Sequence, residues 1–144
     1  MLMNKKPKIL IVSTNSDEAG VPKHVECIIS ELSEDFTFNC IFGYKRGPLI
    51  ERLRAKSIQC SEIKELKSKI SISADIKSLI KLIVECKKFN PDIIHAHSSK
   101  AGLLARMTGF YCDIPCIYTC HGWPWRGLPV VSRSFAWLSE FLAS

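Results

Sequence analysis

The chain has 144 residues, of which 47% are hydrophobic and 24% are charged, with seven glycines and seven prolines. This composition is typical of one globular domain and excludes collagen-like, low-complexity and disordered chains. The length is too short for a (β/α)₈ barrel, which needs about 200 residues or more. A net charge of +6, with no long like-charged run, argues against nucleic acid as a partner. The charge fits a phosphate, a nucleotide or an acidic membrane surface, and it equally fits a lysine-rich solvated surface.

The cysteines and the apolar runs indicate where the protein works. Seven cysteines, none of them in a Cys-x-x-Cys pair, are typical of reduced thiols in the cytoplasm. The apolar run at residues 9–12 is too short for the core of a signal peptide, and no stretch approaches the 18 apolar residues of a membrane span. We therefore expect a cytoplasmic protein whose basic charge suits peripheral contact with the inner face of an anionic membrane.

Apolar runs and helical periodicities alternate along the chain. The predicted strands cover residues 8–14, 36–42, 58–63, 92–97 and 115–119, and the predicted helices cover residues 21–32, 47–56, 71–89, 100–109 and 131–142. In the third helix we expect Ile76, Leu79, Ile80 and Ile83 to form the buried stripe, after a cap at Ser71 or Ser73. Alternating strands and helices, with strands that are apolar throughout, predict an α/β fold. Its form is a Rossmann-like parallel sheet with helices on both faces.

Ligands of such sheets bind beyond the carboxyl ends of the strands, so the segments that follow the strands matter most. The first of these has one glycine, Gly20, before a helix, and it lacks the Gly-x-Gly-x-x-Gly and Gly-Lys-Ser/Thr patterns. The sequence therefore argues against nicotinamide binding and P-loop chemistry. A single glycine at a helix N-terminus lets a phosphate approach backbone N–H groups, and it equally serves to permit the turn.

Two later segments carry polar and aromatic side chains. Ser98, Ser99 and Lys100 open a helix after the fourth strand, where they suit phosphate or sugar oxygens or act as a plain helix cap. His121 and Trp123, separated by Gly122, follow the fifth strand. An imidazole can hydrogen-bond hydroxyls or move protons, and an indole can stack on a sugar; the alternative is an aromatic lid that packs locally.

The histidines raise the question of a metal. His95 and His97 alternate on one face of the fourth strand, and a metal site there needs two more ligands, for which Asp17, Glu18 and His121 are the candidates. We predict no metal site. We expect His95 to be buried and His97 to lie at the end of the strand.

Three segments together resemble the motifs of glycosyltransferase family 4. Residues 19–25 (AGVPKHV) resemble the Gly-Gly-x-x-x-His loop of the family, with Ala19 in place of its first glycine. Residues 91–104 (PDIIHAHSSKAGLL) resemble its PDIVHAHSSKAG stretch, and residues 118–123 (YTCHGW) are similar to its YT-x-HGW turn. The motifs occur in the order of the family, each at a predicted strand end.

The resemblance implies the N-terminal, acceptor-side lobe of a GT-B enzyme, in which two Rossmann-like domains face each other across a cleft. It implies transfer of a sugar, with retention, from a nucleotide-diphosphate sugar to a lipid-linked or polysaccharide acceptor, with no cofactor or metal. By this likeness His121 is the catalytic residue that faces the donor sugar, Gly20 approaches the diphosphate and His24 lines the acceptor side. The other implied substrate-binding residues are His97, Ser98, Ser99, Lys100, Gly122 and Trp123.

The resemblance also sets an expectation for the domain. In the family a second domain, which follows this lobe, holds the nucleotide and carries a Glu-x₇-Glu signature, and we expect that domain to be absent from residues 1–144. We expect residues 1–144 to be a single, incomplete domain that is inactive alone and that would pair with a separate C-terminal half. The alternative is a non-catalytic Rossmann-like module that binds an anionic lipid surface or a partner protein.

Overall fold

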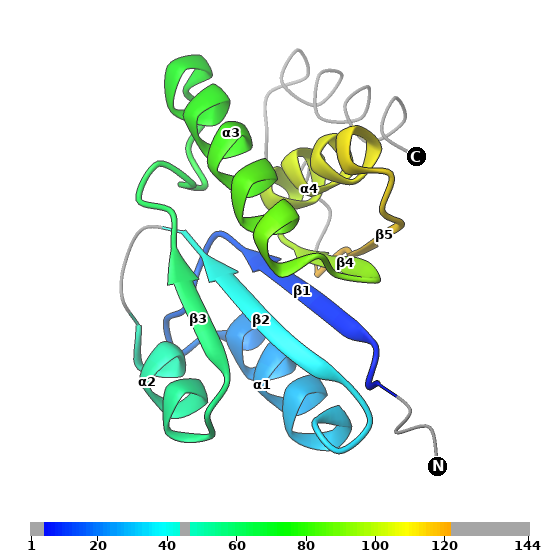
Figure 1. The fold of residues 1–144 in the computed structure, drawn as a ribbon. Helices are drawn as coiled ribbons and strands as arrows, with labels where there is room; N and C mark the ends of the chain where they lie inside the picture. The colour runs from blue at the N-terminus through cyan, green and yellow to red at the C-terminus, as the bar shows by residue number, and fades with distance from the viewer. Residues whose placement is uncertain (1–4, 44–46, 122–144) are drawn as a thin grey trace.

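The computed structural model describes residues 5–43 and 47–121 (Figure 1). Within these ranges, five strands alternate with four helices, as the apolar pattern predicts. In chain order they are β1 (Lys8–Ser13), α1 (Gly20–Leu32), β2 (Thr37–Phe42), α2 (Pro48–Ala55), β3 (Gln59–Glu62), α3 (Ile72–Phe89), β4 (Ile93–His97), α4 (Ser99–Cys112) and β5 (Cys116–Thr119). The predicted last helix, residues 131–142, lies outside the described residues.

Local chemistry explains where the helices begin and end. Pro48 begins α2, where its missing N–H costs no helical hydrogen bond. Ser71 is the cap residue of α3, and the backbone N–H of Ser71 donates a hydrogen bond to the Asp75 carboxylate at 3.1 Å. The helix ends at Asn90, whose left-handed φ of 51° turns the chain before Pro91.

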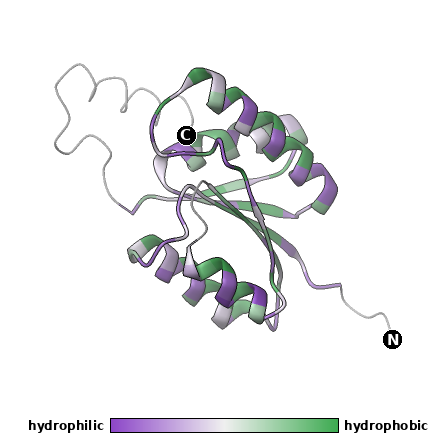
Figure 2. Ribbon diagram, turned by 90° about the vertical axis from the view of Figure 1, so that its left-hand side faces the viewer, coloured by the Kyte–Doolittle hydropathy of each residue, from purple (hydrophilic) through white to green (hydrophobic). Residues whose placement is uncertain are grey.

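All five strands are parallel and lie in the order β3-β2-β1-β4-β5. β1 is central, and Ile11 pairs with Cys40 of β2 on one side and with His95 of β4 on the other. Helices α1 and α2 cover one face of the sheet, and α3 and α4 cover the other (Figures 1 and 2). The structure therefore has the predicted α/β, Rossmann-like architecture.

The sheet separates two hydrophobic cores, because successive side chains of a strand point to opposite faces. Ile11 of β1 packs with Val25 and Ile29 of α1 and with Leu53 of α2. Leu10 and Val12 of the same strand belong to the other core, which contains Leu82 and Cys86 of α3 and Leu104 of α4. All seven cysteines are free thiols.

The predicted buried stripe of α3 is wrong in part. The residues of α3 that are buried are Ser78, Leu82 and Cys86, while Ile76 and Ile80 are 54% and 57% exposed. Leu79 is partly buried against the core. The helix carries apolar side chains on two sides, and the smaller residues allow the closer approach to the sheet and to α4.

Candidate functional site

A cavity of about 560 Å³ opens at the carboxyl edge of the sheet, where β1 and β4 lie side by side. The chain leaves β1 toward a helix on one face and leaves β4 toward a helix on the other, so the two loops diverge and leave a space between them. The cavity is lined by the loop after β1, by the first turn of α1, and by Ser68, Ser98 and His121. The cavity thus lies at the edge of the sheet where the sequence predicts a site.

Four histidines gather beside this cavity. His97 ends β4 and is fully buried, with its Nδ1 at 2.9 Å from Nε2 of His121. The ring of His24, from α1, lies with its centroid 5.0 Å from that of His121 and 5.7 Å from that of His97. The His95 ring lies 4.3 Å from the His97 ring, and its Nε2 is 2.7 Å from Oγ1 of Thr119. Histidines from three separate segments therefore form one cluster.

Burial keeps the inner members of the cluster uncharged. Desolvation, together with the neighbouring imidazoles, lowers the pKa of His97 to about 3. Burial, followed by the charges of His24 and His121, also lowers the pKa of His95, and burial and His24 lower that of His121. The neutral form of His97 is therefore the stable one at pH 7, and Nε2 of this ring has no hydrogen-bond partner among the described residues.

The described residues that could hold a metal ion are His24, His97 and His121, whose ligand nitrogens lie within 4.8 Å of one another. This set differs from the one considered in the sequence, because it combines one histidine of the His-x-His pair with imidazoles from two other elements. His97 and His121 face each other at hydrogen-bond distance, whereas two nitrogens on one tetrahedral zinc lie about 3.3 Å apart for Zn–N bonds of about 2.05 Å. The metal-free site remains a prediction.

Hydroxyl groups also line the cavity. Thr14 donates a hydrogen bond from Oγ1 to Oγ of Ser98 at 3.0 Å, and Ser68 donates from Oγ to Thr14 at 3.4 Å. Ser98 has a φ of 79°, a backbone conformation that non-glycine residues rarely adopt and that is found preferentially at functional sites. The lining of the cavity therefore combines imidazoles with hydroxyls, which suits the hydroxyls of a sugar.

The structure divides the predicted site residues into three groups. Gly20, His24, Ser98 and His121 line the cavity, and His97 lies beneath them, in contact with His24 and His121. The side chains of Ser99 and Lys100 have other partners: Oγ of Ser99 is 3.3 Å from the Tyr118 hydroxyl, and Nζ of Lys100 is 2.7 Å from Oδ1 of Asp75. Gly122 and Trp123 lie outside the described residues.

Two findings go beyond the sequence prediction. Thr14 and Ser68 line the cavity, although neither was among the predicted residues. Ser68 lies in the segment that follows the short strand β3. The rule that ligands bind beyond the carboxyl ends of strands also applies to that segment, and it is the signal by which Ser68 could have been found. His97 lies at the end of its strand as predicted and is fully buried, whereas His95, which was predicted to be buried, is half-buried.

Comparison with known proteins now identifies the domain. The model of Glycosyltransferase Family 4 matches residues 20–143, which include α1, the motif at the end of β4 and the segment after β5. The chain belongs to glycosyltransferase family 4. A curated relative of the family 4 chain is the UDP-Gal:alpha-D-GlcNAc-diphosphoundecaprenol alpha-1,3-galactosyltransferase of Escherichia coli, which is 35% identical over 114 residues. That match covers 77% of this chain and 29% of the relative, so the chain spans less than a third of the relative's length.

Solved structures of other proteins share the fold of this family 4 domain. A glycosyltransferase from Rickettsia africae superposes with a TM-score of 0.69 at 19% identity, over 91% of this chain and 33% of that one. The Anabaena protein HepE, solved in complex with UDP, gives a TM-score of 0.67 at 15% identity, over 90% and 33% of the two chains. A putative UDP-N-acetylglucosamine 2-epimerase from Listeria monocytogenes gives 0.69 at 14% identity, over 96% and 37%. These similarities show the α/β, Rossmann-like fold.

Proposed function

We propose that residues 1–144 form the acceptor-side part of a retaining glycosyltransferase that transfers a sugar from a nucleotide-diphosphate sugar to a lipid-linked or polysaccharide acceptor. The observation that carries the proposal is the convergence of His24, Ser98 and His121 on one cavity. They come from three motifs far apart in the sequence of a family 4 domain. Family membership favours this function over a non-catalytic binding module.

In the proposed reaction the acceptor hydroxyl forms a bond to the anomeric carbon of the donor sugar. The bond from that carbon to the diphosphate breaks, its electron pair leaves with the nucleoside diphosphate, and the proton of the acceptor hydroxyl passes to the leaving diphosphate oxygen. His121 would contact the donor sugar as a neutral imidazole, which can donate one hydrogen bond and accept another. Buried His97 would hold the His121 ring in place through the 2.9 Å hydrogen bond. Gly20, at the start of α1, would leave room for the diphosphate, since an added Cβ there meets nothing within 4 Å.

The acceptor and the location belong to the same proposal. The E. coli relative is named for a substrate linked to diphosphoundecaprenol, a lipid carrier. A lipid-linked acceptor would place the reaction at the inner face of the cytoplasmic membrane. We further propose that the nucleotide is held mainly by a second domain outside residues 1–144, as the family resemblance implies; the match with the E. coli relative covers 29% of that protein.

The proposal is tested with a chimera in which residues 1–144 replace the matching segment of the E. coli galactosyltransferase. The chimera is incubated with UDP-galactose and the lipid-linked acceptor, and product is followed by thin-layer chromatography. We expect transfer by the chimera and none by the 144-residue chain alone. His121→Ala should lower the rate by about 100-fold or more, the usual effect of removing a side chain that stabilises the transition state.

A matched pair of variants on α1 separates the site from the surface around it. His24→Ala removes a ring that lines the cavity, whereas Lys23→Ala changes its exposed neighbour, which lies outside the lining. We expect the first variant to slow transfer and the second to leave it unchanged. Transfer by the 144-residue chain without any partner, or a chimera that is unaffected by His121→Ala, would contradict the proposal.

A further inference from the structure

The outer side of α3 carries a row of exposed isoleucines. Ile72, Ile76, Ile80 and Val84 recur every four residues, each more than half exposed, and cover about 18 Å of the helix. Ile70, in the loop before α3, extends the row and is 83% exposed. On the α1–α2 side of the sheet, the described residues expose one large apolar side chain, Leu32, at 36%. A contiguous apolar row on one layer alone is characteristic of a binding surface.

Lysines surround this row. Residues 64–88 contain seven lysines against three acidic residues, and Lys67 and Lys69 lie next to Ile70 in the loop. Two of the three acidic residues are ion-paired, Glu65 with Lys81 and Asp75 with Lys100, each at 2.7 Å. The surface is therefore both apolar and positively charged. That combination is typical of a helix lying in the interface of an anionic bilayer, where lysine stems follow the apolar surface while their ammonium groups meet lipid phosphates.

The same loop reaches the candidate site. Ser68 lines the cavity and donates a hydrogen bond to Thr14, while Ile70, only two residues further on, is exposed to solvent. Two residues span about 7 Å at most. Nζ of Lys100 donates a hydrogen bond to the backbone oxygen of Lys69, which fixes the loop to the start of α4. The apolar row therefore begins within a few ångströms of the cavity.

We propose that the isoleucine–lysine face, formed by Ile70, Ile72, Ile76, Ile80 and Val84 with Lys67 and Lys69, docks on the surface of an anionic lipid bilayer. None of the described helices is long and apolar enough to cross a bilayer. In the proposed contact, α3 lies along the bilayer surface. The inference rests on the proposed function in one respect, namely that a lipid-linked acceptor would keep its tail in the bilayer while its sugar enters the cavity. The face would hold the cavity at the level of the lipid headgroups.

The experiment is flotation of the purified 144-residue chain with phosphatidylcholine vesicles, with and without phosphatidylglycerol. We expect binding to the anionic vesicles only, weakened by 1 M salt, which shortens the Debye length to about 3 Å. The double variant Ile72→Ser/Ile76→Ser should lower the partition constant by about tenfold or more, because two side chains no longer bury apolar surface. Lys67→Glu/Lys69→Glu should lower it through charge repulsion.

Matched controls lie elsewhere on the molecule. Phe110→Ser removes a 94% exposed aromatic ring near the far end of α4. Lys23→Glu/Lys56→Glu makes the same charge change on the α1–α2 side. We expect both controls to bind vesicles like the unmodified chain, and thermal unfolding followed by circular dichroism to show that every variant is folded.

Three results would overturn the proposal. The first is unchanged flotation of the Ile72→Ser/Ile76→Ser variant, and the second is an equal loss of flotation in the Phe110→Ser control. The third is that the unmodified chain self-associates with increasing concentration instead of binding vesicles, and that the Ile72→Ser/Ile76→Ser variant no longer self-associates. The last result would assign the face to a second copy of the chain. Flotation needs neither donor nor acceptor, so a failure of sugar transfer in the chimera leaves this test intact, and the two outcomes can be told apart.

Discussion

At the scale of single residues, the buried imidazole of His97 couples the site to the stability of the fold. The ring is fully buried at the end of β4, and its pKa of about 3 results first from desolvation and then from His95, His121 and His24. In the unfolded chain a histidine titrates near 6.5. Between these two values the unfolded state therefore binds more protons than the folded state, and the difference approaches one proton in the middle of the interval.

This difference predicts a pH-dependent stability. The contribution of neutral His97 is fully present above pH 6.5 and is lost as the pH falls toward 3, at about 1.4 kcal/mol per pH unit. We expect the free energy of unfolding, measured by urea titration, to fall between pH 6.5 and 5. His97→Gln, which cannot titrate, should make this pH dependence less steep. Parallel slopes in the two proteins would contradict the prediction.

Single residues also show how far sequence patterns reach. The motifs placed His97 and His121 at strand ends and His24 in the helix after the first strand. Period-two alternation placed His95 and His97 on one face, as the 4.3 Å ring contact shows. The pattern could not predict how deeply each histidine ring is buried, because burial depends on the residues that pack around the ring. The Thr14–Ser98 hydrogen bond was equally out of reach, since it joins residues 84 positions apart.

At the scale of elements, the amphipathic pattern of α3 was ambiguous. Ile72, Ile76, Ile80 and Val84 satisfy a helical repeat as well as Ser78, Leu82 and Cys86 do, and hydrophobicity alone favours the first set. The structure buries the second set because its smaller members fit against the sheet and α4. The position of the helix was predictable from its sequence, but its rotation about its own axis was decided by packing.

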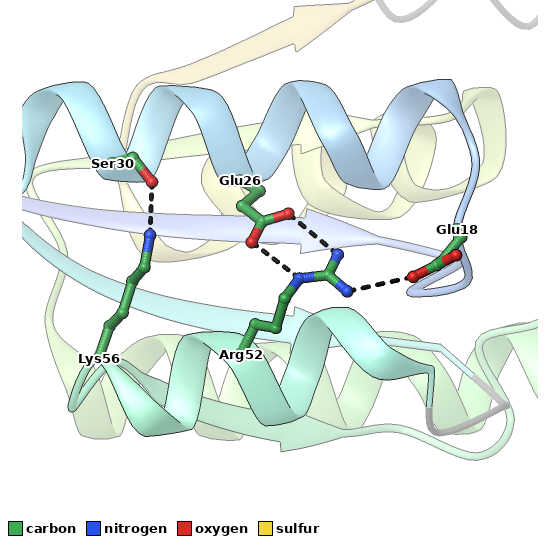
Figure 3. Close-up of polar contacts among 5 residues, drawn as sticks. All are labelled: Glu18, Glu26, Ser30, Arg52 and Lys56. Carbon is green, nitrogen blue, oxygen red and sulfur yellow. Dashed lines mark hydrogen bonds and ion pairs between the residues drawn. The ribbon is translucent and has the colours of Figure 1, made fainter.

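The pair of helices on the opposite face is joined by charge. Arg52 of α2 donates two hydrogen bonds to the Glu26 carboxylate of α1, at 2.8 and 2.9 Å, and a third to Glu18 at 3.4 Å (Figure 3). Glu18 lies in the loop between β1 and α1, which borders the cavity. Arg52 therefore connects α2 both to α1 and to the loop that leads to the site.

We expect Arg52→Met to lower the free energy of unfolding at pH 7 by up to about 1 kcal/mol, as for partly exposed ion pairs. Its hydrogen bonds, and then its charge, lower the pKa of Glu26 below 4.5. This stabilisation is present above pH 4.5 and is lost as the pH falls below it, so the two proteins should converge in acid. Lys56→Met, which removes one exposed hydrogen bond to Ser30, is the control in the same urea titrations. A larger effect of Lys56→Met than of Arg52→Met would contradict the assignment.

At the scale of the whole molecule, the alternation of apolar strands and helices was enough to predict the parallel sheet and the edge that carries the cavity. β1 is apolar throughout because each of its faces meets a different core, with Ile11 on one side and Leu10 and Val12 on the other. The strand order was not predicted, since the sequence does not specify which neighbours pair. That order matters for function, because it puts β4 beside β1 and thereby joins the loops that form the cavity.

Because both cores share one sheet, the two layers should unfold together. Leu82→Ala removes a buried side chain on the α3–α4 side, and Leu53→Ala removes one on the α1–α2 side. We expect each variant to lower the free energy of unfolding by about 2–5 kcal/mol, the usual effect of such a cavity. Hydrogen exchange measured by mass spectrometry at increasing urea should then show the same loss of protection in α1 and in α3, whichever layer carries the substitution. A variant that accelerates exchange in its own layer alone, while the amides of the opposite layer keep their original protection, would show that the central sheet does not couple the two cores.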